Sequence, residues 1–216
     1  MTARILTVNV GSAVPTEHSS MPTTGIDKLP VESIHVADPG PRDGVGGSGV
    51  RGDEVSDVRH HGGTRQAVYA YAREELEWWE RELDRELRSG LFGENLTTTG
   101  FDVDESLVGE RWVVGDVLLE VCGPRIPCRT FAGHLGERGW VKRFTQRGRT
   151  GAYLSVVTPG TITAGTSITR VDIPDHDITV PVLFRAYMGD KQEAARVLEA
   201  DVLPEPYRAE LVARLR

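Results

Sequence analysis

The spacing of apolar residues along the chain predicts a body of short β-strands. Apolar and β-branched residues alternate with polar ones, or run together between turn residues, as is typical of strands. The predicted strands are residues 4–10, 31–36, 66–71, 110–121 (with a turn at Gly115 and Asp116), 152–157 and 166–171. Short strands with a single helix among them favour a barrel or a sandwich over an alternating parallel sheet.

A helical period marks the one helix predicted within this body, at residues 73–87. The residues that recur on its apolar face are Leu76, Trp79, Leu83 and Leu87. Gly90 is the expected C-terminal cap. Trp78 and Trp79 could form a stacking platform for a ligand, but paired aromatic residues on an amphipathic helix more often belong to the core.

From about residue 177 the pattern changes to three short helical segments. Their sequences are VPVLFRAYM, KQEAARVLEA and EPYRAELVARLR. Asp190 and Pro204 are typical start residues for the second and third helices. We therefore expect a mainly β chain of the α+β class, with a β-barrel at residues 1–172 and a three-helix extension at residues 173–216.

The composition is that of a globular protein. Of the 216 residues, 39% are hydrophobic and 26% are charged, and the net charge is -7. This charge argues against broad binding of nucleic acid, which needs an excess of Lys and Arg. The N-terminus lacks the features of a signal peptide, and no apolar run is long enough to span a membrane. With only two cysteines, we expect a cytoplasmic protein without nucleic-acid or membrane partners.

The segment from Pro124 to Arg129 carries the most informative chemistry. Its two prolines restrict the backbone on both sides of Ile126, and its arginines stabilise a thiolate at Cys128. A thiolate is the ligand that soft metals prefer, and we extend this preference to molybdenum. The alternative is that Cys128 is an inert buried side chain. Cys122 lacks metal-site spacing and is expected to be structural.

Residues 125–149 hold a local excess of positive charge, with seven basic side chains against one acid, Glu137. The basic residues are Arg125, Arg129, Arg138, Lys142, Arg143, Arg147 and Arg149. This excess favours an anionic ligand, most simply one that bears a phosphate. A solvated basic face is the alternative, and the few aromatic residues in the stretch make an RNA surface a poorer explanation.

Two glycine-containing loops offer further groups to a ligand. Their candidate residues are His60, His61, Gly62 and Gly63 in the first loop, and Gly93, Glu94 and Asn95 in the second. The glycines permit close approach of a ligand to the backbone. The paired histidines could ligate zinc, but a four-ligand set is absent. Taken singly, each loop can also be an ordinary turn.

Two other cofactor classes have weaker support. Gly44, Gly46 and Gly49 match the G-x-G-x-x-G pattern of dinucleotide sites, but the strand–turn–helix context is missing. Pyridoxal phosphate would need a Schiff-base lysine. The available lysines are Lys28, Lys142 and Lys191. None lies in a convincing site, so this class ranks last.

Four stretches taken together resemble the MOSC family, named for the C-terminal domain of molybdenum cofactor sulfurase. They are residues 60–71 (HHGGTRQAVYAY), 91–102 (LFGENLTTTGFD), 108–128 (VGERWVVGDVLLEVCGPRIPC) and 149–165 (RTGAYLSVVTPGTITAG). Their joint order is specific, although each alone is not. The three-helix extension is similar to that of the bacterial stand-alone members that reduce N-hydroxylated bases.

The resemblance implies that the chain binds the molybdenum cofactor (molybdopterin). Cys128 matches the family's cysteine, which ligates molybdenum in the reductase branch and for which sulfur chemistry has been proposed in the sulfurase branch. The HHGG and GEN loops would line the same cleft. Nearby basic residues, with Arg125, Arg129 and Arg149 as candidates, would bind the cofactor's phosphate.

The expected activity is the reduction of N-hydroxylated small molecules such as hydroxylaminopurines, a detoxifying reaction. Two cysteines cannot hold a Cys-ligated iron–sulfur cluster, and no flavin or haem motif is present, so an external reductase must supply electrons. The helical extension would serve to dock that donor or to form a homodimer. The alternative is a non-catalytic carrier that stores the cofactor or holds a persulfide on Cys128.

Overall fold

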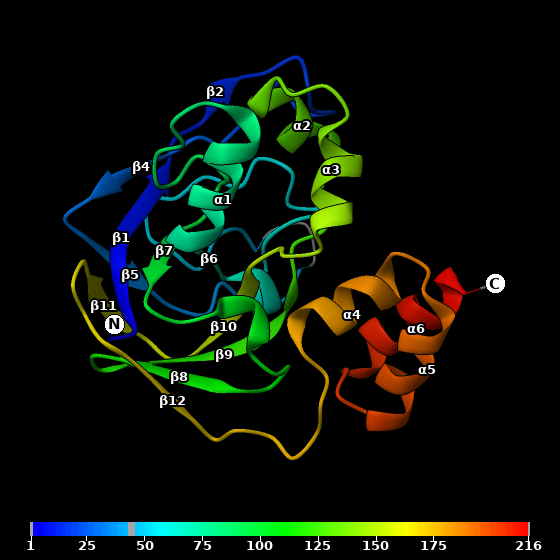
Figure 1. The fold of residues 1–216 in the computed structure, drawn as a ribbon. Coiled ribbons are helices and arrows are strands. Elements are labelled where there is room, and N and C mark those ends of the chain that lie inside the picture. The colour runs from blue at the N-terminus through cyan, green and yellow to red at the C-terminus, as the bar shows by residue number, and fades with distance from the viewer. Residues whose placement is uncertain (1, 43–45, 216) are drawn as a thin grey trace.

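The strands gather into one large sheet and two small ones. The computed structural model describes residues 2–42 and 46–215 (Figure 1). The strands are β1 Arg4–Gly11, β2 Val14–Pro15, β3 Thr23–Thr24, β4 Lys28–Val31, β5 Ser33–Val36, β6 Val68–Ala72, β7 Leu96–Thr99, β8 Arg111–Val114, β9 Val117–Pro124, β10 Ala152–Thr158, β11 Gly160–Thr163 and β12 Ile168–Val171. In this part of the chain the large sheet has the order β12-β8-β9-β10-β6-β7-β1-β4, while β11 pairs with β5 and β2 with β3.

The prediction of a closed barrel is wrong, because the large sheet has two free ends, β12 and β4. The N-H of Ile5 at the start of β1 donates to the carbonyl of Thr166 at 2.9 Å, just before β12. In contrast, β4 pairs with the other end of β1, from Val8 to Gly11. The edge strands therefore lie at opposite ends of β1, and they do not pair among the described residues.

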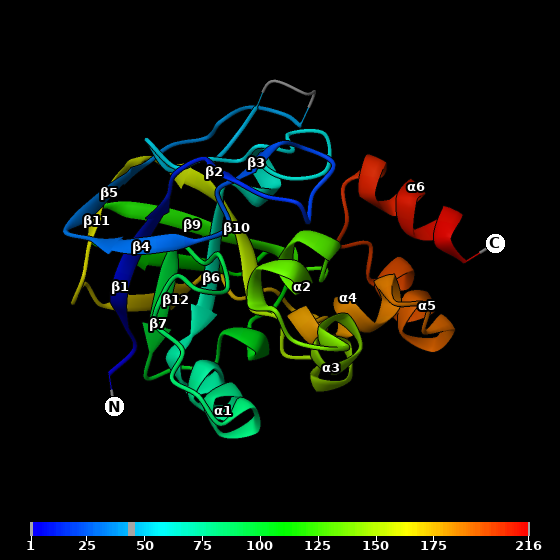
Figure 2. The same cartoon turned by 90° about the horizontal axis from the view of Figure 1, so that it is seen from above.

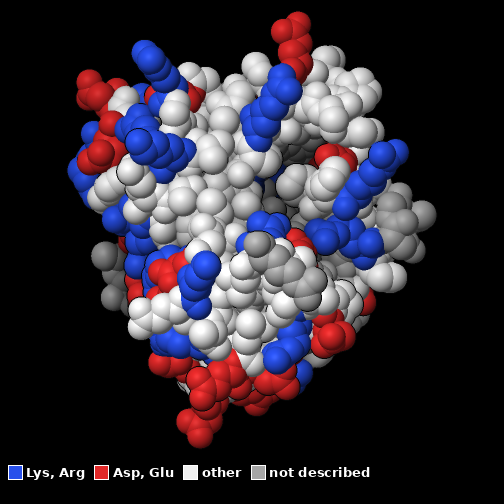
Figure 3. Space-filling model, turned by 90° about the vertical axis from the view of Figure 1, so that its right-hand side faces the viewer, with Lys and Arg blue, Asp and Glu red and all other residues white. Residues whose placement is uncertain are grey.

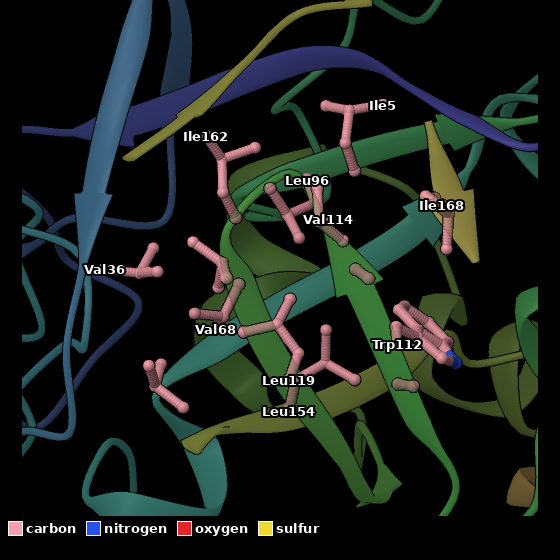
Figure 4. Packing of buried hydrophobic residues seen from close by; sticks show 14 of the residues in the cluster. Ile5, Val36, Val68, Leu96, Trp112, Val114, Leu119, Leu154, Ile162 and Ile168 are labelled. Atoms are coloured by element: carbon pink, nitrogen blue, oxygen red, sulfur yellow. The ribbon is translucent and has the colours of Figure 1, made fainter. Parts of the chain in front are cut away.

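One apolar core lies between the large sheet and the β5–β11 pair. Figure 4 shows side chains from both sheets converging on it. Trp112, Leu119 and Leu154 come from the large sheet, and Val36 and Ile162 come from β5 and β11; all five are fully buried. Burial of each such side chain contributes about 1.5–3 kcal/mol, so this core fixes the β-strands that carry the site.

Three helices form a second layer beside β6 and β10 (Figure 2). They are α1 Arg73–Leu83, α2 Arg129–Leu135 and α3 Trp140–Arg147. Between them lies an aromatic cluster, in which the rings of Trp79 and Trp140 are 4.5 Å apart. Trp79 is only 1% exposed, so the core interpretation of this tryptophan is confirmed.

Helix α1 ends at Leu83, earlier than predicted, and Gly90 is not its cap. Asp84 adopts a left-handed conformation with φ 49° and its N-H bonds to the carbonyl of Glu80. The Glu80 carboxylate then accepts the N-H of Leu87 at 2.8 Å. The chain thus folds back over the last turn, and Leu87 reaches the core from outside the helix.

The C-terminal residues form the three predicted helices, α4 Val180–Tyr187, α5 Lys191–Ala200 and α6 Glu205–Arg214. Asp190 caps α5 as expected, accepting the N-H of Gln192 at 3.0 Å. Helix α4 contacts the body, since the N-H of Val180 donates to the carbonyl of Ser106. The division of the chain at residue 172 stays a prediction. Among the described residues, no helix combines the length and apolar character needed to cross a membrane.

Candidate functional site

Cys128 stands where the chain passes from β9 into α2. It occupies the N-cap position of α2 and its side chain is partly buried. Burial raises the pKa of its thiol, but a hydrogen bond from His61 and the positive charge of Arg125 outweigh this effect and lower the pKa to about 7. A substantial fraction of the side chain is therefore thiolate at neutral pH, the form that binds metals and attacks electrophiles.

Cys128 lines a pocket of about 100 Å³, whose other lining residues come from distant parts of the sequence. The lining side chains that bear on its chemistry are those of Lys28, His61, Arg125, Cys128 and Tyr153, and Gly93 contributes backbone. The structure thus brings together Cys128 and one residue each from the HHGG loop, the GEN loop and the basic stretch. Because the side chain of Cys128 lines this pocket and is only partly buried, it is not enclosed in the core.

Arg125 is a buried cation in the wall of this pocket. It is only 7% exposed, and its guanidinium lies 4.2 Å from the ring centroid of Phe131 and 5.0 Å from that of Tyr69. One terminal nitrogen donates to the carbonyl of Phe92 at 2.7 Å. Its Nε is buried and has no partner among the described residues. A buried donor of this kind favours an anionic or carbonyl-bearing ligand.

Lys28 is a second buried cation in the same pocket, although the sequence suggested it only as a possible Schiff-base lysine. Its ammonium pairs with Asp53, whose side chain is 1% exposed. Burial lowers the pKa of Lys28, although the Asp53 carboxylate opposes this change. Asp53 also accepts the N-H of Gly11 at 2.7 Å and the amide of Asn95 at 3.0 Å. Lys28 is therefore held rigidly at the pocket wall.

A larger cleft of about 270 Å³ adjoins the pocket, and His61 and Tyr153 line both. Four arginines line this cleft: Arg42, Arg59, Arg65 and Arg214. It also contains Tyr187 and Tyr207 from α4 and α6. Figure 3 shows a hollow on this side of the molecule with basic side chains around it. The basic character of the site comes largely from these residues and not from residues 129–149.

Gly62, Gly63 and Glu94 stabilise the conformation of their own loops, whereas His60 lines the larger cleft. Gly62 and Gly63 have φ near 80°, and a Cβ at either would strike the backbone of residues 42 or 47. Glu94 is fully buried and accepts the N-H groups of Gly90 and Phe92. Burial raises the pKa of Glu94. His60 is exposed and lines the larger cleft, with its ring against Asp57.

Asn95 likewise acts within the scaffold. Its amide oxygen accepts the N-H of Tyr69 at 3.2 Å, and its nitrogen donates to the carbonyl of Asn9. Together with Glu94 it joins the GEN loop to the strands on either side. Neither residue lines the two cavities described above.

The other predicted phosphate ligands, Arg129 and Arg149, do not line the pocket around Cys128. Arg129 is exposed at the start of α2. Arg149 pairs with Glu75 at 2.7 Å and with Asp102, and Arg147 pairs with the same glutamate at 2.9 Å. The basic stretch is thus partly neutralised by acids from α1 and from the loop after β7.

The described residues give no support to a zinc site or to a dinucleotide site. No group of three or more His, Cys, Asp or Glu side chains that could hold a metal ion comes together in residues 2–42 and 46–215. Gly44 of the G-x-G-x-x-G match lies outside the described residues. Gly46 and Gly49 lie in a loop packed against its neighbours and not at the start of a helix.

The MOSC domain profile matches residues 57–169, which include the HHGG loop, the GEN loop and Cys128. The chain belongs to the MOSC family. Lys28, Arg42 and Arg214 lie outside the matched segment, so the MOSC region accounts for only part of the cavity walls.

Relatives of this MOSC protein are found at the level of sequence and of structure. The uncharacterized protein YflK of Bacillus subtilis is 28% identical over 214 residues, which is 97% of this chain and 93% of YflK. A protein of Gibberella moniliformis named Reductase is 34% identical over 131 residues, 59% of this chain but only 23% of that protein. The crystal structure of YiiM from Geobacillus stearothermophilus superposes with a TM-score of 0.76 at 25% identity, covering 99% of this chain and 100% of YiiM.

Sequence reasoning missed several residues that line this MOSC site. Arg59 directly precedes the HHGG loop, so its position next to a recognised motif was a usable signal. Lys28 and Arg214 carry no such signal, because only the fold brings them to the cavities.

Proposed function

We propose that this protein binds a molybdenum cofactor through Cys128 and uses it to reduce N-hydroxylated small molecules of the hydroxylaminopurine type. The observation that carries the proposal is a thiol with a pKa of about 7 that lines a pocket beside two buried cations, Lys28 and Arg125. Membership of the MOSC family, which is associated with this cofactor, and a relative named Reductase support the same reading.

The groups around Cys128 fit a cofactor that combines a soft metal with anionic substituents. The thiolate supplies one metal ligand, so the cofactor itself must supply the others. The unpartnered Nε of Arg125 is satisfied by an oxygen acceptor, and the cations compensate negative charge in a place where water is partly excluded.

Each side chain then has a definite task. Cys128 would hold the metal, and His61, which lines the same pocket, keeps the sulfur in its thiolate form. Arg125 stabilises negative charge at the pocket wall, and Lys28, whose charge Asp53 balances, adds an ammonium donor there. When bound, the cofactor would supply the two-electron chemistry that cleaves an N–O bond, which no side chain can do; two protons leave with the oxygen as water. An external reductase supplies the electrons.

A carrier of the cofactor, or of a persulfide on Cys128, would use the same thiolate. The two functions differ in turnover, because a carrier holds its cargo and a reductase converts substrate repeatedly. A test must therefore measure binding and turnover in the same preparation.

The experiment is expression with molybdate, followed by metal analysis and an assay with an N-hydroxylated purine and a reduced viologen dye as donor. We expect molybdenum to approach one atom per chain and the amine to accumulate over many turnovers. Cys128→Ala should lose both, whereas the matched control Cys122→Ala should keep both. Stoichiometric molybdenum without turnover would favour the carrier, and retention of molybdenum by Cys128→Ala would refute ligation by this cysteine.

A further inference from the structure

The cleft beside the thiol pocket has walls from two parts of the chain that are far apart in sequence. Arg59 and Arg65 come from the loop before β6, and Tyr207 and Arg214 come from α6. We propose that this cleft binds a planar heterocycle carrying a phosphate, and that α6 supplies part of the site. This proposal rests on the function proposed above and extends it to the C-terminal helices.

The charge of the cleft selects for an anion. Of its described lining residues, the one acid is Glu210, and it pairs with Arg214 at 2.8 Å. Arg59 has no carboxylate partner within the described chain, and Arg42 donates only to the carbonyl of His60 there. Arginines left with free donors in a concave site bind phosphate oxygens in preference to neutral groups.

The tyrosines of the cleft select for a flat ligand. Arg65 lies 5.0 Å from the ring centroid of Tyr207, and Arg214 lies 5.4 Å from that of Tyr187. Arg65 also donates to the carbonyl of Cys122 at 2.7 Å, so its guanidinium is held between β9 and α6. Aromatic faces and guanidinium planes stack on heterocyclic rings, whatever substituents the rings carry.

The position of the cleft connects this ligand to the thiol. His61 and Tyr153 line both cavities, and Cys128 lines the smaller one with them. A ligand with its phosphate among the arginines can therefore extend past His61 toward the sulfur. Two sources share this chemistry: the phosphate-bearing pterin of the cofactor, and a nucleotide form of the N-hydroxylated purine.

The first arm of the test is a calorimetric titration with adenosine 5′-monophosphate, using protein expressed without molybdate. Adenosine and inorganic phosphate are titrated separately, and each should bind more weakly because it carries half of the required groups. Arg214→Gln and Arg59→Gln should each weaken binding of the nucleotide about tenfold. Arg59 lies outside the helical extension, so its effect cannot arise from unfolding of α6.

The matched control is Arg196→Gln on α5. Arg196 resembles Arg214 in exposure, 38% against 42%, and is likewise paired with an acid, but it does not line the cleft. The affinity of Arg196→Gln for adenosine 5′-monophosphate should equal that of the wild type.

In the second arm, each protein is expressed with molybdate and gel-filtered, and the retained pterin is measured by fluorescence after oxidation.

The two arms identify the source of the phosphate. Loss of nucleotide binding in Arg214→Gln and Arg59→Gln supports a nucleotide ligand, and loss of retained pterin supports the cofactor. If both ligands bind the variants as well as the wild type, or if neither ligand binds the wild type, the proposal is overturned. Failure of the proposed function is seen separately, as wild-type protein that binds the nucleotide but takes up no molybdenum.

Discussion

At the scale of single residues, the two cysteines have opposite electrostatic environments. Burial raises the pKa of Cys122, whereas His61 and Arg125 lower that of Cys128 to about 7. We predict that iodoacetamide modifies Cys128 much faster than Cys122 at pH 7, with the rate for Cys128 rising through a midpoint near pH 7. In His61→Ala a stabilising donor is lost, so the pKa rises and the rate at pH 7 falls several-fold. Peptide mass spectrometry measures both rates, and an unchanged midpoint in His61→Ala would contradict the assignment.

The buried pair of Lys28 and Asp53 leads to a second prediction at this scale. Asp53→Asn leaves the ammonium without its anion in a site that is almost closed to water. Removal of one partner of a buried pair costs about 3–5 kcal/mol, so we expect that loss in the free energy of unfolding by urea. The double variant Lys28→Met with Asp53→Asn should recover part of it. Equal stability of Asp53→Asn and the wild type would show that the pair is not buried in solution.

The same pair shows why the sequence identified only part of the site. Cys128, His61 and Gly93 lie in motifs whose residues can be recognised locally. Lys28 is remote in sequence from Cys128 and has no distinctive neighbours, so only pairing of β4 with β1 and binding to Asp53 place it at the pocket. Arg149 was selected because it is close to Cys128 in sequence, but α3 carries it toward Glu75.

At the scale of elements, the strands were predicted better than the helices between residues 129 and 147. Alternating apolar residues predicted β1, β8, β9 and β10, because each strand buries one face. Helices α2 and α3 were missed because they are short, with seven and eight residues, and are flanked by the cap glycines Gly136, Gly139 and Gly148. Their apolar positions, Phe131, Trp140 and Phe144, meet in one cluster only after folding. Closure of the sheet was wrongly expected because periodicity does not show which strand edges pair.

The end of α1 gives a prediction at this scale. Asp84 is exposed and has a positive φ of 49°, which costs a residue with a Cβ about 1 kcal/mol relative to glycine. We expect Asp84→Gly to unfold at a higher temperature than the wild type, and Asp84→Ala at a lower one, with about 1 kcal/mol between the two variants. Thermal denaturation followed by circular dichroism measures the difference. Equal stability of the two variants would mean that the helix does not end at this residue.

At the scale of the whole molecule, the helical extension and the body line one cleft in addition to their packing contact. The helical period separated the extension from the body. The need of an isolated reductase for an electron donor suggested a docking role for it, with dimerisation as the alternative. The larger cleft favours a ligand-binding role instead, because Tyr187, Tyr207 and Arg214 line it together with arginines of the body. A ligand held by both parts should therefore couple them.

This coupling gives the last prediction, made for hydrogen exchange with adenosine 5′-monophosphate. At a ligand concentration about ten times the dissociation constant, binding adds about 1.4 kcal/mol to the stability of the bound state. Amides of α6 and of the loop at residues 57–66 should exchange more slowly with the nucleotide, because opening either wall releases the ligand. Amides of α1, which lies outside the cleft, serve as the control and should be unchanged. In Arg214→Gln the protection of α6 should disappear. Protection confined to the loop would show that the ligand binds the body alone and that α6 takes no part in the site.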